Sequence, residues 1–115
     1  MPTFVEEQLP ESINIQSSLV KNPNTTLIIK VSGDSMVDVG IQPGDRVLVD
    51  KVVPFKTGDT VVAMIENEFT VKLLMQNGRG YFLRAANKEK QYPDIHPSVE
   101  RNVVGKVVSS FRTYD

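Results

Sequence analysis

The feature that most constrains the fold of this 115-residue chain is a series of short apolar runs, spaced about ten residues apart from Thr26 onward. The runs are rich in Val, Ile and Phe, which favour extended backbone, and glycine, proline, asparagine and aspartate separate them. Short strands with tight turns are typical of antiparallel sandwiches and barrels. We therefore expect a mainly β fold, a compact antiparallel β domain. The expected strands are 27–31, 46–50, 60–65, 69–75, 81–85 and 103–108, the last of which runs on to Phe111.

The chain is long enough for one folded domain. Residues 1–25 are polar, acidic at their start and interrupted by prolines. We interpret them as a mobile N-terminal arm, with one short helix over 14–21 that Asn22-Pro23 would end. Residues 26–115 make up the β domain.

Composition excludes several classes of function. The chain has no cysteine, which excludes disulfides, thiolate zinc sites and cysteine nucleophiles. Its formal charge of −1 gives no bulk attraction for nucleic acid, so direct nucleic-acid binding is not expected. We find no signal peptide, no apolar run long enough to span a membrane and no phosphate-binding or dinucleotide motif. We expect a cytoplasmic protein without membrane contact and without a cofactor.

A serine on a glycine-containing turn follows the first long apolar run, in Ser32-Gly33-Asp34-Ser35-Met36. Gly33 permits a sharp turn that can expose the Ser35 hydroxyl. The same turn can point the backbone N–H groups of Asp34 and Ser35 into one concavity, which is the geometry of an oxyanion hole. The alternative is an ordinary loop in which the serine and aspartate side chains cap backbone groups.

A lysine lies inside the apolar run 69–75. A period of two places Lys72 on the same strand face as Thr70 and Leu74. Burial disfavours a charged ammonium and lowers the pKa of a fully buried lysine by ~3–5 units, so a neutral Lys72 amine could accept the proton of a serine. The alternative is a lysine on a solvated strand face.

Other catalytic or metal-binding arrangements are weaker. His96 could act as a general base with Asp94 or Glu100, but a lone histidine in a charged loop is usually only solvated. Three aspartates could suggest a metal site, yet each lies at a strand boundary where turn chemistry explains it. They are Asp45, Asp50 and Asp59.

Taken together and in order, the motifs resemble the LexA/UmuD family of self-cleaving Ser–Lys proteins, over about residues 13–108. The resemblance implies that Ser35 is the nucleophile, Lys72 its general base, and the backbone N–H groups of Asp34 and Ser35 the oxyanion donors. It also implies a LexA/signal-peptidase-like β domain that forms a homodimer. The matching segments are 31–36, Gly40-Ile41, Gly44-Asp45, Gly58-Asp59 and 68–72.

Within this family the chain looks most similar to UmuD in its processed form, UmuD′. That likeness implies an accessory subunit of an error-prone translesion DNA polymerase in the SOS response. The partners would be the polymerase subunit and the RecA–single-stranded-DNA filament, which stimulates self-cleavage of the N-terminal arm. The alternative is the C-terminal peptidase and dimerisation domain of a LexA-like transcriptional repressor, which we rank second because no helix-turn-helix segment precedes the arm.

Family members are cut at an Ala-Gly or Cys-Gly bond, and neither dipeptide occurs in the chain. We interpret the chain as a cleaved product or a naturally short homologue. A competing class is a pure binding module in which the dyad is a relic. A signal peptidase shares the chemistry but would need a membrane anchor. The apolar last strand, 103–111, is the expected dimer interface, because an unpaired terminal strand would be a liability.

Overall fold

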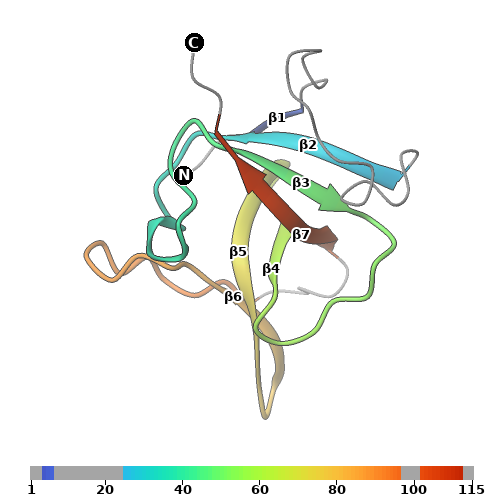
Figure 1. Ribbon diagram of the computed structural model, residues 1–115. Helices are drawn as coiled ribbons and strands as arrows, with labels where there is room; N and C mark the ends of the chain where they lie inside the picture. The colour runs from blue at the N-terminus through green and yellow to red at the C-terminus, as the bar shows by residue number, and fades with distance from the viewer. Residues whose placement is uncertain (1–3, 7–24, 97–101, 113–115) are drawn as a thin grey trace.

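The computed structural model describes residues 4–6, 25–96 and 102–112, and every structural statement below concerns these residues. They form one seven-stranded antiparallel sheet (Figure 1) and a short 3-10 helix, η2. The elements are β1 (Phe4–Glu6), β2 (Thr26–Val31), η2 (Val37–Val39), β3 (Arg46–Asp50), β4 (Thr60–Ile65), β5 (Glu68–Asn77), β6 (Gly80–Arg84) and β7 (Val103–Phe111).

The predicted fold class is confirmed, and each of the six predicted strands is present with its ends shifted by at most two residues. The strand order is β1-β2-β3-β7-β4-β5-β6. In Figure 1, β2 and β3 cross the direction of β4 and β5 at a steep angle, which shows how strongly the sheet twists. β1 falls within the segment interpreted as an arm and pairs with β2. The predicted helix over 14–21 lies outside the described residues.

The hairpin of β4 and β5 fixes the position of Lys72. Its turn residues Glu66 and Asn67 both have positive φ, 51° and 65°, as the two-residue turns that match strand twist require. The resulting register places Lys72 opposite Val61 of β4. Val61 is fully buried, so the hairpin holds the lysine beside an apolar neighbour.

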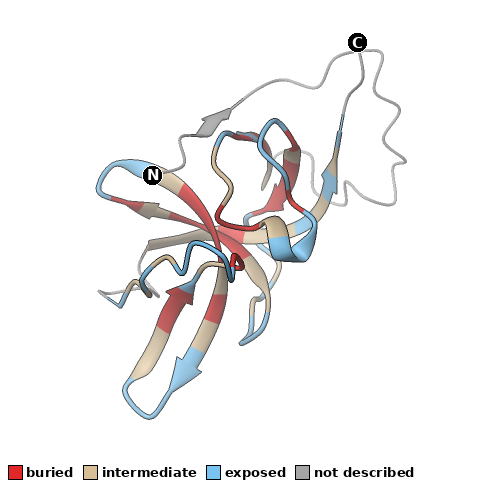
Figure 2. Cartoon of the chain, turned by 90° about the vertical axis from the view of Figure 1, so that its left-hand side faces the viewer, coloured by how far each residue is buried: buried red, intermediate tan, exposed pale blue. Residues whose placement is uncertain are grey.

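Alternation along the strands divides the buried side chains between two clusters. On β5, Val71 belongs to the first cluster and Leu74 to the second, as a period of two requires. Figure 2 shows the buried residues along the strands and the exposed ones at the hairpin tips. The first cluster is Ile29, Val31, Met36, Ile41, Val47, Val49, Val62, Val71 and Ala86, and the second is Val61, Ala63, Ile65, Leu74 and Leu83.

The premise for a dimer through the last strand is wrong. β7 is not an unpaired terminal strand, because it lies between β3 and β4 and pairs with both. β7 approaches β3 closely at Gly105, where a Cβ atom would lie 2.6 Å from the backbone oxygen of Asp50. The strand at each end of the sheet order is instead β1 or β6, so the argument from an unpaired edge no longer points to β7.

Candidate active site

The nucleophile candidate lies in the loop between β2 and β3. This loop is closed at its base, where Gly44 N–H donates to the Val31 carbonyl at 2.6 Å and Val31 N–H donates to the Asp45 carbonyl at 2.7 Å. The side chain of Met36 is 1% exposed and anchors the turn in the first cluster. Ser35, directly before it, is itself only 3% exposed.

The lysine reaches this serine from β5. Lys72 Nζ lies 2.9 Å from Ser35 Oγ, 2.7 Å from Thr70 Oγ1 and 3.2 Å from the Val71 carbonyl oxygen. Thr70 is fully buried and Lys72 is 4% exposed. The structure therefore brings together two residues 37 positions apart, and it excludes the solvated-face alternative for Lys72.

Burial lowers the pKa of Lys72 from 10.5 to about 8. The physical cause is the loss of hydration, which penalises the ammonium form. All three of the hydrogen-bond partners given above are neutral oxygens, and no ion pair joins Lys72 to a carboxylate within the described part of the chain. A substantial fraction of the amine is therefore neutral at mildly alkaline pH and able to accept the Ser35 proton.

A second segment, which was not predicted from the sequence, holds the serine turn in place. Ala86 N–H donates to the Ser35 carbonyl at 2.7 Å, and Asp38 N–H donates back to the Ala86 carbonyl at 2.8 Å. Asn87 Nδ2 donates to the Asp34 carbonyl at 2.9 Å. A partner 53 positions away leaves no periodic trace.

The carboxylate beside the nucleophile is occupied by other groups. Asp34 accepts a hydrogen bond of 2.6 Å from the Tyr92 hydroxyl and forms an ion pair with the Lys90 ammonium. Lys90 and then Tyr92 hold the pKa of Asp34 below its usual value. This carboxylate is thus engaged by the 87–92 loop and not by Lys72.

Among the described residues, no hydrogen bond joins the alternative base His96 to Asp94. Asp94 accepts two hydrogen bonds of 3.1 Å from Arg84, and His96 stacks on the Phe82 ring at 5.2 Å. Glu100 lies outside the described residues. The aspartates considered for a metal instead cap turns, and no group of three potential ligands that could hold a metal is found among the described side chains. Asp45 accepts from Gln42 N–H, Asp50 from Val52 N–H and Asp59 from Lys56 N–H.

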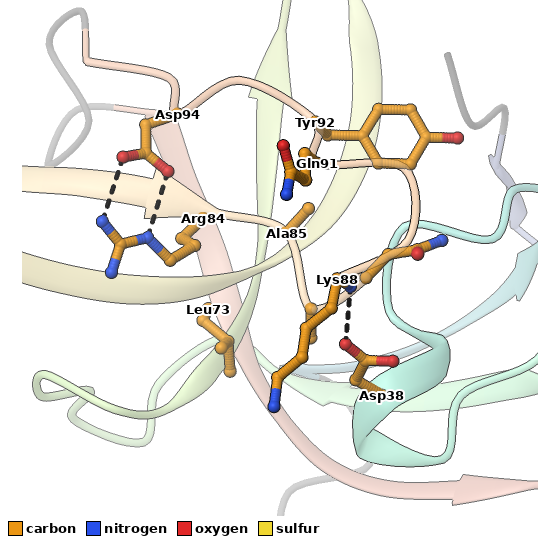
Figure 3. A pocket seen from close by; sticks show the side chains of 10 residues that line it. Asp38, Leu73, Arg84, Ala85, Lys88, Gln91, Tyr92 and Asp94 are labelled. Carbon is orange, nitrogen blue, oxygen red and sulfur yellow. Dashed lines mark hydrogen bonds and ion pairs between the residues drawn. The ribbon is translucent and has the colours of Figure 1, made fainter.

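A cavity of about 370 Å³ lies near this region, between η2, the end of β6 and the loop that follows β6. Figure 3 shows Arg84 and Asp94 paired on one side and the backbone of Lys88 bonded to Asp38 on the other. Leu73 lines the cavity. Successive strand residues point to opposite faces, so the Lys72 side chain leaves β5 on the other side. Neither Ser35 nor Lys72 lines the cavity, but Ala86 and Asn87, which hold the serine turn, do.

A family model described as Peptidase S24-like matches residues 1–108. The chain belongs to this family. Among similar proteins, a LexA repressor of Clostridium perfringens is 36% identical and one of Syntrophobacter fumaroxidans is 38% identical. The first match covers 99% of this chain and 55% of the relative, and the second covers 93% and 51%. The chain thus spans about half the length of these curated relatives.

The family assignment confirms the resemblance deduced from the Ser35 and Lys72 motifs. Peptidase S24 members are self-cleaving serine peptidases. The names of the relatives fit the LexA-like alternative better than the UmuD′-like interpretation that we ranked first. No helix in the described part of the chain has the length and apolar character needed to cross a membrane.

Proposed function

We propose that this chain is the Ser–Lys peptidase and dimerisation domain of a LexA-like repressor, with Ser35 as nucleophile and Lys72 as general base. The observation that carries the proposal is the 2.9 Å contact between Ser35 Oγ and Lys72 Nζ in a buried site. Ser–Lys pairs are a known variant of the serine-nucleophile arrangement. The repressor context rests on the names of the similar proteins.

In the first half of the reaction, the neutral Lys72 amine takes the proton of Ser35 as Oγ attacks the carbonyl carbon of the scissile bond. The negative charge that develops on the carbonyl oxygen is received by the backbone N–H groups of Asp34 and Ser35. When the intermediate collapses, the C–N bond breaks and the Lys72 ammonium returns a proton to the leaving amine.

In the second half, water attacks the resulting ester while Lys72 again accepts a proton. The ester C–O bond breaks, and Lys72 returns the proton to Ser35 Oγ. Thr70 and the Val71 carbonyl accept hydrogen bonds from Nζ at 2.7 and 3.2 Å. These contacts keep the amine at the serine through both proton transfers.

The substrate in this proposal is a segment of the repressor's own chain, cut when a RecA–single-stranded-DNA filament is encountered in the cytoplasm during the SOS response. The working form is a homodimer. A UmuD′-like accessory subunit of an error-prone polymerase is the second candidate.

The proposal is tested by reacting the purified 115-residue chain with a fluorophosphonate, whose phosphorus atom accepts Ser35 Oγ while fluoride leaves. Mass spectrometry locates the label and gives its rate. We expect the label on Ser35 and a rate that rises with pH around a midpoint near 8, set by the pKa of Lys72. Lys72→Ala should lower the rate by about 10²–10⁴-fold, the usual contribution of a general base.

Two matched controls separate the site from the rest of the chain. Ser110 and Lys51 are exposed, so Ser110→Ala and Lys51→Ala should react like the unmodified chain. Undiminished labelling of Lys72→Ala would refute the dyad. The two candidate functions are separated by the residues encoded upstream of Met1 and by damage-induced mutagenesis, which a UmuD′-like subunit supports after Ser35→Ala.

A further inference from the structure

The carbonyl of the peptide bond between Asp34 and Ser35 accepts two hydrogen bonds, a short one from the side chain of Asn87 and a long one of 3.4 Å from Val37 N–H. Asn87 Nδ2 donates to the Asp34 carbonyl at 2.9 Å. The other end of the same amide is also engaged, because Asn87 Oδ1 accepts Lys90 N–H at 3.2 Å. Asn87 is 7% exposed, so this carboxamide is fixed in a largely dry environment.

Planarity carries this constraint across the peptide. A trans peptide unit is flat, and its C=O and N–H groups point in opposite directions. The described chain has no cis peptide, so fixing the Asp34 carbonyl also fixes the direction of the Ser35 N–H, away from Asn87. Among the described loops and turns, the Ser35 N–H donates to no backbone carbonyl. It is the kind of preset donor that an oxyanion requires.

The next peptide bond is held from the same segment. Ala86 N–H donates to the Ser35 carbonyl at 2.7 Å. Two adjacent residues, Ala86 and Asn87, therefore hold the peptide units on both sides of the Ser35 Cα atom. With both units fixed, the backbone dihedral angles of Ser35 are fixed as well, and with them the place of its Cβ atom, from which Oγ reaches Lys72 Nζ at 2.9 Å.

We propose that Asn87 is a positioning residue of the peptidase site. Its carboxamide sets the direction of the Ser35 N–H and, by polarising the peptide, strengthens that group as a donor to the oxyanion. Asn87 acts through the backbone and does not touch Lys72 or the reacting atoms. The proposal rests on the Ser35–Lys72 mechanism above.

Two variants remove the donor in different ways. Asn87→Asp keeps the shape and the acceptor for Lys90 N–H but replaces the donating nitrogen by an oxygen. Asn87→Ala removes the whole amide without adding charge. In both we expect the fluorophosphonate rate to fall about 10- to 100-fold, as for a displaced catalytic group, with the midpoint still near 8 in Asn87→Ala because the surroundings of Lys72 are unchanged.

The matched control is Tyr92→Phe. It removes the hydrogen bond to the Asp34 carboxylate but leaves the Asp34–Ser35 peptide bonded to Asn87. Its labelling rate should stay within about twofold of the unmodified chain, since the Asp34 carboxylate keeps its ion pair with Lys90 and the Asp34 carbonyl keeps its hydrogen bond from Asn87. A comparable fall in Tyr92→Phe would mean that any disturbance of the 87–92 loop slows the reaction, and would overturn the special role of Asn87.

A second measurement separates this proposal from the dyad itself. In ¹⁵N–¹H NMR spectra, the Ser35 amide signal should move in Asn87→Ala and Asn87→Asp, and stay in place in Tyr92→Phe. If the unmodified chain is not labelled on Ser35, the dyad fails, while the NMR shift still tests the backbone contact. If the unmodified chain is labelled and both Asn87 variants react at its rate, the positioning role is refuted.

Discussion

The two halves of the candidate site are held by different kinds of structure. Lys72 lies inside β5, which pairs with β4 on one side and β6 on the other. Ser35 lies in a loop that separate hydrogen bonds from Ala86 and Asn87 keep in place. The environment of Lys72 is therefore a property of the sheet and its core. The geometry of Ser35 depends on a few polar contacts that can be removed one at a time.

The same contrast appears between two lysines. Lys72 is buried, has only the neutral hydrogen-bond partners described above, and has its pKa lowered. Lys90 is exposed, pairs with Asp34, and has its pKa raised by that partner. The carboxylate of Asp34, next to Ser35, is thus paired with a surface lysine. This arrangement leaves the buried lysine without a counter-ion that would keep it protonated.

The largest expected effect is on the free energy of unfolding, because Lys72 is buried without a carboxylate partner among the described residues. Above pH 10.5 Lys72 is neutral in both the folded and the unfolded chain, and burial then costs nothing through ionisation. As the pH falls from 10.5 to about 8, the unfolded chain takes up a proton that the folded chain does not. Below about 8 the penalty is constant, at about 3 kcal/mol for this difference in pKa.

Lys72→Met removes this penalty. The free energy of unfolding of the variant, minus that of the unmodified chain, should be about 3 kcal/mol larger at pH 7 than at pH 10.5. Urea denaturation at both pH values measures it, and contributions of other titrating groups cancel in the difference. A difference that is the same at both pH values would show that the pKa of Lys72 is not lowered.

A carboxylate placed at Thr70 should reverse the pKa shift. Thr70 Oγ1 lies 2.7 Å from Lys72 Nζ, and an opposite charge at such range raises the pKa of a lysine by about 1–3 units. In Thr70→Asp the midpoint of labelling should move from about 8 to about 10. At pH 8 this lowers the neutral fraction, and with it the rate, by up to about a hundredfold.

Thr70→Asn is the matched control, because it has the shape of aspartate without the charge. Its midpoint should stay near that of the unmodified chain. Equal midpoints in the two variants would mean that the charge balance around Lys72 does not control the reaction, and that position 70 matters only for packing.

The part of the site on β5 could be predicted from the sequence because its signals are local. A period of two along 69–75 placed Lys72 and Thr70 on one face, and the turn residues bounded the strands. The hydrogen bond between those two side chains was not predicted, although the shared face was the available signal. That Lys72 is buried could not be read from β5 alone, since it depends on Val61 and on the loop of Ser35.

The contacts of the loop that carries Ser35 could not be predicted in this way, because they join segments far apart in the sequence. Neither the bond of Asn87 to the Asp34 carbonyl nor the ion pair of Lys90 with Asp34 has a periodic signal. The place of β7 between β3 and β4 was missed for a related reason, since strand order depends on which strands pair across the whole chain and not on local pattern. The roles proposed for Ser35 and Lys72 came from the combined motifs, which neither segment carried alone.

A smaller effect on the free energy of unfolding is expected at Asp45, where the loop that carries Ser35 leads into β3. Asp45 is 2% exposed and accepts hydrogen bonds from Gln42 N–H at 2.8 Å and from Arg112 at 2.6 and 3.0 Å. Arg112 holds the pKa of this carboxyl below 3.8. Asp45→Asn should lower the free energy of unfolding by about 2 kcal/mol at pH 7, as expected for charged hydrogen bonds.

The effect of Asp45→Asn on the free energy of unfolding should depend on pH. A carboxylate with a lowered pKa stabilises the folded chain above its ordinary value of 3.8, and that stabilisation is lost as the pH falls through the lowered pKa. The difference between the unmodified chain and Asp45→Asn should therefore shrink below about pH 4. Denaturation at pH 7 and pH 3 measures this, and a difference that persists undiminished at pH 3 would assign the effect to shape alone.

The smallest effect is expected at the rim of the cavity. Arg84 and Asp94 form a bidentate pair, but their side chains are 47% and 29% exposed, and such pairs contribute little to stability. Arg84→Gln should leave the labelling rate within about twofold, because the contacts given for Arg84 are with Asp94 and the Phe82 ring and with neither Ser35 nor Lys72. A loss of about tenfold or more would exceed what a surface pair supplies. It would mean that the groups around this cavity reach the reacting atoms.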